Sequence, residues 1–297
     1  MKLGLFSVSY AGLWGQAALP LPEFIARAGR LGFASVTLMG KRPHLSPLDA
    51  TPDFVKSLKE ALKRAVVSCN VIAAYTNLAP GAAAEVPTIE FQIASVESLA
   101  GIAAQLGASV VRVFTAYETE GQDMQRAWDR VVAALREMCD RAAPHGITLA
   151  IQNHHDLALH TEALLELLAE INRPNCKLGF DAWSPGLRGE DLYQAARLAA
   201  PHTVLTTNAD YLRVPRYRYQ PALVNYERQS PDWVRAVPFG TGFIDYAAFF
   251  RGLREGGFDG LAVYEMCSPL RGGGALENLD ACAAKYLEWM RAHRLAD

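Results

Sequence analysis

The 297-residue sequence predicts a single α/β domain with the (β/α)8 TIM barrel fold, spanning residues 1–297. Apolar runs alternate with segments of helical spacing along the whole chain, and eight such pairs fit this length. A doubly wound open sheet is the alternative, but it usually has a glycine-rich phosphate turn after its first strand. The first turn here, "SYAGLWGQ", has different glycine spacing. The barrel is therefore the better interpretation.

The first half of the chain contains four of these pairs. Gly32 is placed to stop the first helix, and Thr51 to cap the second helix ahead of a proline at its first position. The expected strands are 2–10, 33–40, 67–75 and 108–117, and the helices that follow them are 20–32, 51–65, 89–107 and 121–146.

The second half repeats the pattern. Its expected strands are 147–154, 176–183, 203–211 and 258–267, and its helices are 160–172, 188–200, 245–257 and 276–294. No low-complexity linker or shift in composition marks a second domain. Residues 212–242 form the longest connection, which we expect to be irregular and to lie over the carboxyl ends of the strands, where barrels build their active sites.

The charge and composition of the chain argue against nucleic-acid-binding and membrane-spanning proteins. The net charge of -2 and the pI of about 6.4 do not favour nucleic acid as a partner, and no apolar segment is long enough for a bilayer. The first residues lack the features of a signal peptide, so we expect a cytoplasmic protein. The five cysteines form no Cys-x-x-Cys pair, which predicts buried thiols; Cys267, beside Glu265, is the one weighed as a nucleophile.

Polar residues at the carboxyl ends of the predicted strands should face one site, because these ends meet on the same face of a barrel. The fifth strand is the clearest case, since "ITLAIQNHHD" passes directly from apolar to polar residues. The candidates are Arg112, Gln152, Asn153, His154, His155, Asp181, Trp183, Thr207, Arg213 and Glu265.

Two of these candidates are carboxylates at the ends of buried strands, Asp181 and Glu265. A buried carboxylate is costly unless it is paired, hydrogen-bonded or bound to a metal. Together with the amide oxygen of Gln152, the two would suit a hard divalent cation. The alternative is an ordinary salt bridge to Arg112.

Two further features leave alternatives open. His154 and His155 are adjacent, so on an extended segment they face opposite ways and at most one faces the site. The segment "RVPRYRYQ", from Arg213 to Gln220, interleaves arginines with tyrosines. It is either a cationic rim for an anionic or polyhydroxyl ligand, or a solvated loop or subunit contact.

The motifs "ITLAIQNHH", "LGFDAWSP", "TVLTTNADYLRVP" and "GLAVYEM" resemble those of the xylose isomerase-like barrel superfamily of sugar phosphate isomerases and epimerases. The resemblance implies a divalent metal held by Glu, Asp, His and Glu at successive strand ends. Carried to this chain, these positions are Gln152, Asp181, Thr207 and Glu265, with Mn²⁺, Mg²⁺ or Co²⁺ as the expected ion and Zn²⁺ as an alternative. Two of the four residues depart from the pattern.

The resemblance also implies a reaction: abstraction of a proton next to a carbonyl of a sugar or keto-sugar, by an isomerase or epimerase. Gln152 cannot act as a base, which disfavours two-base epimerisation and assigns the proton transfer to His154 or Glu265. Arg112, Asn153, His155, Trp183 and Arg213 are then expected to bind substrate.

Several alternatives remain open beside this reaction. One is a metal-assisted lyase or dehydratase, or a C-glycoside-cleaving enzyme, acting on a keto-sugar or cyclitol. Another is a non-catalytic sugar-binding subunit. A DNA phosphodiesterase is disfavoured by the slightly acidic charge and by only seven histidines. The expected partners are a small-molecule sugar and a second copy of the chain in a homo-oligomer, with no nucleic acid and no membrane.

Overall fold

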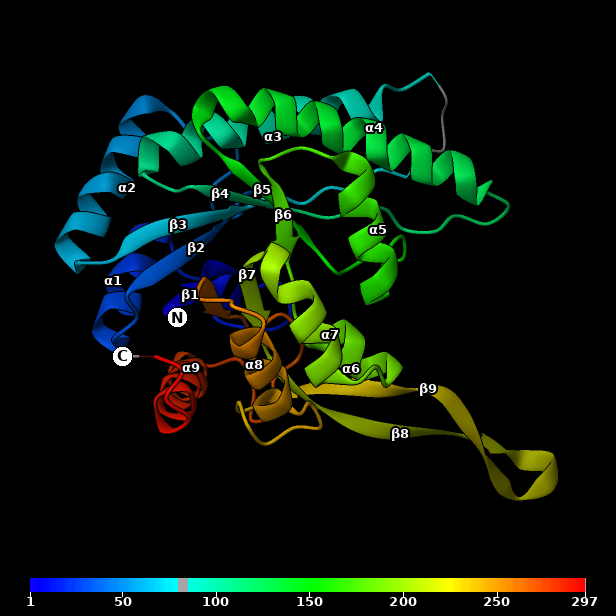
Figure 1. Ribbon diagram of the computed structural model, residues 1–297. Coiled ribbons are helices and arrows are strands. Elements are labelled where there is room, and N and C mark those ends of the chain that lie inside the picture. Colours follow the sequence, from blue (N-terminus) through cyan, green and yellow to red (C-terminus); the bar gives the residue numbers. More distant parts are fainter. Residues whose placement is uncertain (80–84, 297) are drawn as a thin grey trace.

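The computed structural model describes residues 1–79 and 85–296 and shows a closed barrel of eight parallel strands (Figure 1). The order around the barrel is β1-β10-β7-β6-β5-β4-β3-β2, which confirms the predicted (β/α)8 fold. The strands are β1 (Lys2–Phe6), β2 (Ser35–Met39), β3 (Ser68–Ala73), β4 (Val110–Val113), β5 (Thr148–Gln152), β6 (Cys176–Gly179), β7 (Thr203–Asn208) and β10 (Leu261–Tyr264).

Helices cover the outside of the barrel, and their predicted end signals act as expected. Thr51 accepts a hydrogen bond from the backbone N–H of Phe54, and Gly32 ends the first helix at a φ of 92°. The helices are α1 (Leu21–Leu31), α2 (Pro52–Ala65), α3 (Thr88–Leu106), α4 (Met124–Ala142), α5 (Thr161–Ile171), α6 (Trp183–Arg188), α7 (Leu192–Ala199), α8 (Tyr246–Glu255) and α9 (Leu276–Ala292).

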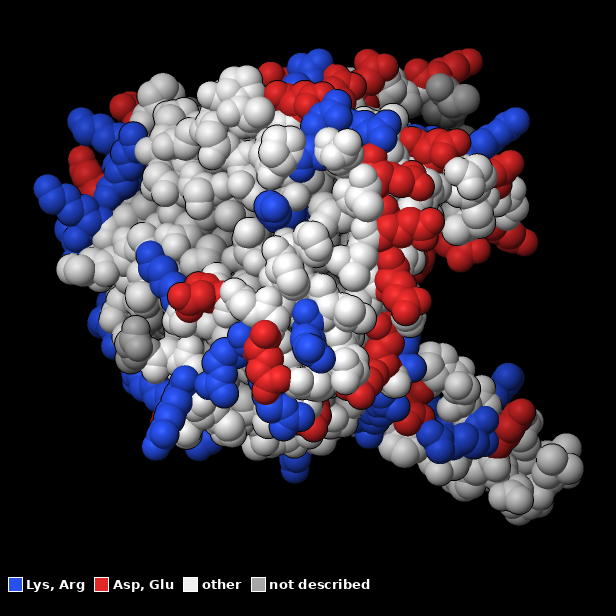
Figure 2. Space-filling model, in the orientation of Figure 1, with Lys and Arg blue, Asp and Glu red and all other residues white. Residues whose placement is uncertain are grey.

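The long connection after β7 differs from the expectation of irregular structure. It forms an antiparallel hairpin of β8 (Asp210–Gln220) and β9 (Asn225–Val237), which projects away from the barrel (Figures 1 and 2). Polar and apolar residues are mixed in this segment, so the sequence offered no continuous apolar run to indicate a strand. The two strands nevertheless pair along most of their length. We call residues 212–235 the arm. Most of its side chains are exposed, whereas Ala236 and Val237 at its base are buried.

The buried apolar residues form two layers, one inside the barrel and one between the strands and the helices. Aliphatic and aromatic side chains fill the barrel interior, among them Phe6, Met39, Val71, Val110 and Val263, and a larger apolar layer lies between strands and helices. The interior is therefore packed, and polar groups gather where the strands end. Among the described residues, no helix is long and apolar enough to cross a membrane.

Candidate functional site

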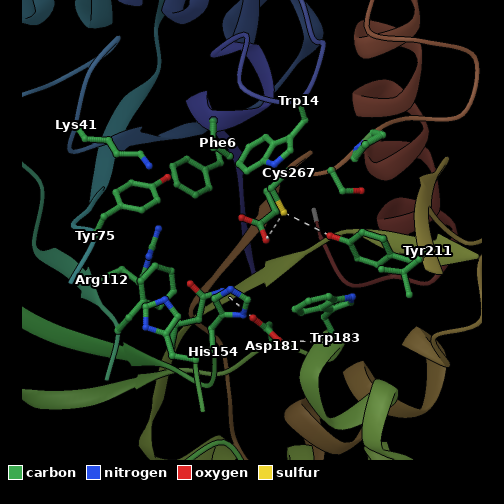
Figure 3. Close-up of a pocket in the computed structure, with 18 of the residues that line it drawn as sticks. Phe6, Trp14, Lys41, Tyr75, Arg112, His154, Asp181, Trp183, Tyr211 and Cys267 are labelled. Carbon is green, nitrogen blue, oxygen red and sulfur yellow. Dashed lines mark hydrogen bonds between the residues drawn. The ribbon is translucent and has the colours of Figure 1, made fainter. Parts of the chain in front are cut away.

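A cavity of about 520 Å³ opens at the carboxyl ends of the strands, where the sequence placed the site (Figure 3). Its wall combines aromatic rings with a few charged groups. Seven predicted residues line it together: Arg112, Gln152, His154, His155, Asp181, Trp183 and Glu265. The barrel thus brings together residues at or just after the ends of β4, β5, β6 and β10 that lie far apart in the sequence.

Gln152 is the last residue of β5, and its buried amide links two neighbouring strand ends. Its Nε2 donates a hydrogen bond to Oδ2 of Asp181 at 2.7 Å and another to Oγ1 of Thr207 at 3.0 Å. Thr207, which the sequence predicted as a metal ligand, is buried on β7 and does not line the cavity. The amide therefore donates both of its N–H groups to Asp181 and Thr207, two of the four residues predicted to bind a metal.

This arrangement does not fit a divalent cation. Metal ligands present oxygen lone pairs to the ion, but Gln152 turns its nitrogen toward Asp181 and Thr207. Within residues 1–79 and 85–296, no group of three or more His, Cys, Asp or Glu side chains is placed to hold a metal ion. Asp181 and Glu265 occupy two of the four expected metal positions. The other two hold Gln152 and Thr207, which supply neither a carboxylate nor an imidazole.

Asn153 does not line the cavity, and its side chain binds the backbone just after β6. Its Nδ2 donates to the backbone oxygen of Asp181 at 2.9 Å, and its Oδ1 accepts from the backbone N–H of Asp181 at 2.8 Å. A carboxylate oxygen of Asp181 in turn accepts from the N–H of Trp183 at 3.2 Å. The sequence predicted that Asn153 binds substrate, but the structure places it where it orients Asp181.

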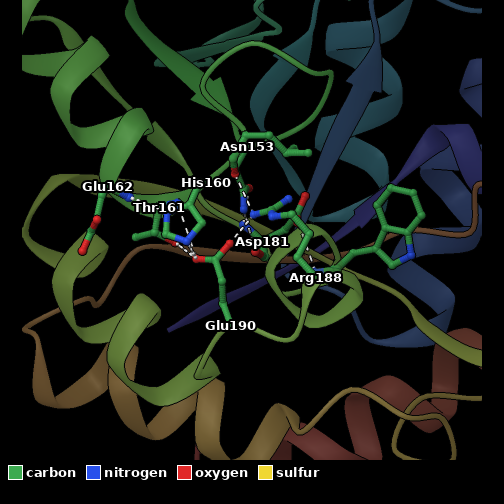
Figure 4. A network of polar contacts seen from close by, with 9 residues as sticks. Asn153, His160, Thr161, Glu162, Asp181, Arg188 and Glu190 are labelled. Carbon is green, nitrogen blue, oxygen red and sulfur yellow. Dashed lines mark hydrogen bonds and ion pairs between the residues drawn. The ribbon is translucent and has the colours of Figure 1, made fainter.

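A second polar network fixes the loop after β5 against the end of α6. Glu190 accepts a hydrogen bond from Oγ1 of Thr161 at 2.6 Å and pairs with Arg188, which also donates to the backbone oxygen of Leu159 (Figure 4). His160 lies 3.8 Å from the same carboxylate. These contacts hold the segments that carry His154, His155 and Trp183.

Arg112 is a buried cation whose guanidinium is stacked among aromatic rings. Its carbon Cζ lies 3.9 Å from the ring centre of Phe114 and 4.9 Å from that of Tyr75. The side chain is only 2% exposed, and Nη1 has no hydrogen-bond partner among the described residues. Burial lowers the pKa of Arg112, although Tyr75 and Glu265 oppose this, and an arginine remains charged near neutrality. It therefore presents a positive charge to the cavity.

The two carboxyl groups lie in environments that favour their protonated forms. Burial raises the pKa of Asp181 to about 7, an effect that the Gln152 hydrogen bond opposes. Burial also raises the pKa of Glu265, and the nearby charge of Arg112 opposes that increase. The predicted alternative, a salt bridge from Arg112 to Asp181 or Glu265, does not form: no ion pair or hydrogen bond joins these described residues, and Arg112 acts on Glu265 only through the attraction of their charges.

Cys267 lies between Glu265 and the hydroxyl of Tyr211. Its thiol donates to Oε1 of Glu265 at 3.5 Å, and its sulfur lies 3.4 Å from the Tyr211 oxygen. Burial raises the pKa of the thiol well above its ordinary value, so it stays protonated. A thiolate is the nucleophilic form of cysteine, and this environment therefore argues against a nucleophilic Cys267.

The prediction that at most one of the two adjacent histidines faces the site is wrong. Both line the cavity, because His155 has a φ of 70° and the segment is not extended. The ring of His155 stacks on Tyr117 at 3.8 Å between centres. Burial lowers the pKa of His154 to about 4 and that of His155 to about 3, so both rings are neutral at pH 7.

Arg213, at the base of the arm, lies outside the cavity lining. Its Nη2 donates to the backbone oxygens of Gly186 at 2.8 Å and Leu187 at 3.3 Å, and its guanidinium stacks on Phe243. Arg213 thus joins the arm to α6. A substrate contact, which the sequence predicted for it, would require these contacts to change.

Several residues of the cavity wall were not among the predicted site residues. Lys41 and Tyr75 follow β2 and β3, and the Lys41 amine lies 4.0 Å from the Tyr75 ring centre. Both stand at the ends of predicted strands, but the prediction gave neither of them a role in the site. Trp14 and Trp233 come from the first loop and from the arm, whose placement no strand pattern indicates.

Comparison with known proteins agrees with this architecture. A sequence model described as xylose isomerase-like TIM barrel matches residues 25–293. The 3-dehydroshikimate dehydratase of Bacillus anthracis is 23% identical over 264 residues, covering 86% of this chain and 88% of that protein.

Solved structures of similar fold include the D-allulose 3-epimerase of Methylomonas sp., with 18% identity, a TM-score of 0.76, and coverage of 99% of this chain and 98% of that one. The 3-keto-D-glucoside 4-epimerase of E. coli has 16% identity, a TM-score of 0.73, and coverage of 98% and 99%. Because the family match spans most of the sequence, this chain belongs to the xylose isomerase-like TIM barrel family.

Proposed function

We propose that this protein is an enzyme that removes a proton from the carbon next to a carbonyl of a small, oxygen-rich substrate, with Glu265 as the base. The observation that carries the proposal is the placement of Glu265, a carboxyl group in the cavity wall whose pKa burial raises. A base with a raised pKa accepts a carbon-bound proton more readily. His154 is the weaker candidate, because burial lowers its pKa to about 4.

Arg112 supplies the positive charge that such a reaction requires. Proton removal beside a carbonyl places negative charge on the carbonyl oxygen, and a preorganised donor in a water-poor site stabilises that charge. Arg112 lines the cavity, its buried Nη1 has no hydrogen-bond partner among the described residues, and its charge is close enough to attract that of Glu265. The guanidinium can therefore bind the oxygen while the carboxylate takes the proton.

The cavity is also suited to a substrate rich in oxygen atoms. Three buried nitrogens in its wall have no hydrogen-bond partner among the residues that the structure describes: Arg112 Nη1, His155 Nδ1 and Trp183 Nε1. Buried polar groups are nearly always hydrogen-bonded, so each of these nitrogens calls for a ligand or a water. Hydroxyl and carbonyl oxygens of a sugar or cyclitol would satisfy them.

Elimination of water is the second candidate, and Asp181 favours it. Burial raises the pKa of this carboxyl to about 7, so near neutrality a part of the molecules carries a proton that could be given to a leaving hydroxyl. Two carboxyl groups with separate roles can serve as acid and base. The similar dehydratase from Bacillus anthracis supports this reading, whereas the similar epimerases support isomerisation.

Proton exchange with solvent tests the proposal. The protein is incubated in D₂O with a panel of ketoses, inososes and 3-dehydroshikimate, and deuterium incorporation and new products are followed by NMR. We expect exchange with at least one compound, and loss of about 10²–10⁴-fold in rate for Glu265→Gln. Glu277→Gln, an exposed carboxylate on α9, is the matched control. Binding without exchange would instead support the sugar-binding subunit.

A further inference from the structure

We infer that the amide of Gln152 takes the place of a metal ion in this barrel: it links the ends of β5, β6 and β7, and the site works without a divalent cation. This role of Gln152 in holding the site together does not depend on the reaction proposed above. The direction of two hydrogen bonds, the charges in the cavity and the pairing of the strands support it.

The hydrogen bonds determine which end of the amide faces Asp181. With nitrogen in this position, both amide N–H groups have acceptors, at 2.7 Å on Asp181 and 3.0 Å on Thr207. The reversed amide would place its oxygen against Oδ2 of Asp181, and when Asp181 is ionised neither oxygen can donate. A cation could be bound only after the amide turned over and both hydrogen bonds broke. In the present orientation, both N–H groups of the amide therefore have hydrogen-bond acceptors without an ion in the site.

The charges in the cavity lead to the same conclusion. Its wall contains two carboxyl groups, Asp181 and Glu265, and two cationic side chains, Lys41 and Arg112. Lys41 and Arg112 are close enough that the Arg112 charge lowers the Lys41 pKa, second to burial. Even with both carboxyl groups ionised, their two negative charges only balance the two cations, so a divalent cation would add two positive charges with no compensation. Arg112 is buried and cannot move its charge into solvent.

The strand pairing shows why a link is needed here. β6 pairs with β7 only through Leu178 with Thr203 and Gly179 with Leu205, with a shift in register between the two pairs. Asp181 and Thr207 lie beyond this short ladder, at ends that no backbone hydrogen bond joins. Gln152 contacts both side chains from β5. Its amide therefore supplies the connection that a shared metal would otherwise make.

The test compares metal binding in the natural chain and in variants, with no substrate present. Purified protein is assayed for bound metals by mass spectrometry, and its Tm is measured with EDTA and with added Mn²⁺ or Co²⁺. We expect far less than one metal per chain and no shift in Tm, because an ion that does not bind the native state cannot stabilise it. About one ion per chain, lost with a fall in Tm on adding EDTA, would overturn the inference.

Restoring ligands provides the positive arm of the test. The double variant Gln152→Glu with Thr207→His adds one carboxylate and one imidazole beside the natural carboxyl groups of Asp181 and Glu265. We expect it to bind about one Mn²⁺ per chain and to gain several degrees in Tm when Mn²⁺ is added. Gln152→Glu alone is the smaller change if the double variant does not fold. A folded variant without metal affinity would contradict the placement of these residues around one ion site.

Gln152→Met is the matched control for the link itself. Methionine keeps the length of the side chain and removes both N–H donors. We expect its Tm to fall while its response to Mn²⁺ stays as small as that of the natural chain. A Tm equal to that of the natural chain would show that the amide does not hold the strand ends, and would overturn the role proposed for it.

Discussion

The side chain of Asn153 forms two hydrogen bonds with the backbone of Asp181, one to its oxygen at 2.9 Å and one from its N–H at 2.8 Å. Both residues are buried, so no water replaces these bonds if they are lost. Gln152 binds the carboxylate of the same residue. Two consecutive residues at the end of β5 thus hold the backbone and the side chain of Asp181.

Asn153→Ala should therefore destabilise the fold. The change leaves the N–H and the oxygen of Asp181 without partners, and we expect the free energy of unfolding to fall by about 2–4 kcal/mol. Urea unfolding measures it. Asn278→Ala is the control, because Asn278 also donates two hydrogen bonds to backbone oxygens, but at the surface. Equal losses in both variants would contradict the importance of burial at Asn153.

The raised pKa of Asp181 predicts how stability depends on pH. Between its ordinary value of 3.8 and about 7, the native state holds a proton that the unfolded chain has lost. The free energy of unfolding therefore falls as pH rises through this range. Asp181→Asn cannot titrate, so we expect its Tm to fall less than that of the natural chain between pH 4.5 and 7.5. The exposed Asp53→Asn should follow the natural chain.

His155 predicts a pH dependence of the opposite sign. Burial, aided by His154 and Arg112, lowers its pKa to about 3, so below pH 6.5 the unfolded chain takes up a proton that the native state does not. Stability is then lost as pH falls. We expect His155→Asn to lose less Tm than the natural chain between pH 7.5 and 5. Asparagine tolerates the φ of 70°, so backbone strain should not obscure the result.

The sequence predicted the barrel and much of the site because both follow from local patterns. Apolar runs and helix caps indicate where the strands and helices lie. In a parallel barrel the carboxyl ends of all strands lie on the same face, so residues at these ends come together. Asp181 and Glu265 were found in this way. His155 was misread because its left-handed φ is a loop property with no glycine to signal it. Trp233 reaches the cavity through hairpin pairing, which depends on a register that spacing alone does not give.

The arm offers a test of the predicted homo-oligomer. Its tip exposes Leu223, Val224 and Tyr226, and a two-stranded hairpin is marginally stable in water unless something covers it. We expect these residues to contact a second copy. The triple variant Leu223→Ser, Val224→Asn and Tyr226→Thr should then have a lower mass by light scattering at a given concentration. Leu48→Ser, an exposed leucine elsewhere, is the control, and a monomeric natural chain would refute the prediction.

Arg112→Met separates catalysis from folding. Methionine keeps an apolar stem against Phe114 and Tyr75 and removes the charge. If Arg112 stabilises the developing oxyanion, kcat/KM for exchange should fall by about 10²–10³-fold. Tm should stay level or rise, because a buried cation with an unpartnered nitrogen is costly to the fold. Lysine at this position should rescue little, since it lacks the planar set of donors.

Arg213→Met is the matched control for this prediction, because Arg213 carries the same group outside the cavity and binds the backbone of α6. We expect it to lower Tm and to leave kcat/KM within about a factor of ten of the natural chain, as the loss of one positioning contact would. An equal loss of activity in both variants would restore the substrate contact that the sequence predicted for Arg213. An Arg112→Met variant that unfolds but keeps its activity per folded molecule would show that the guanidinium serves the fold, not the reaction.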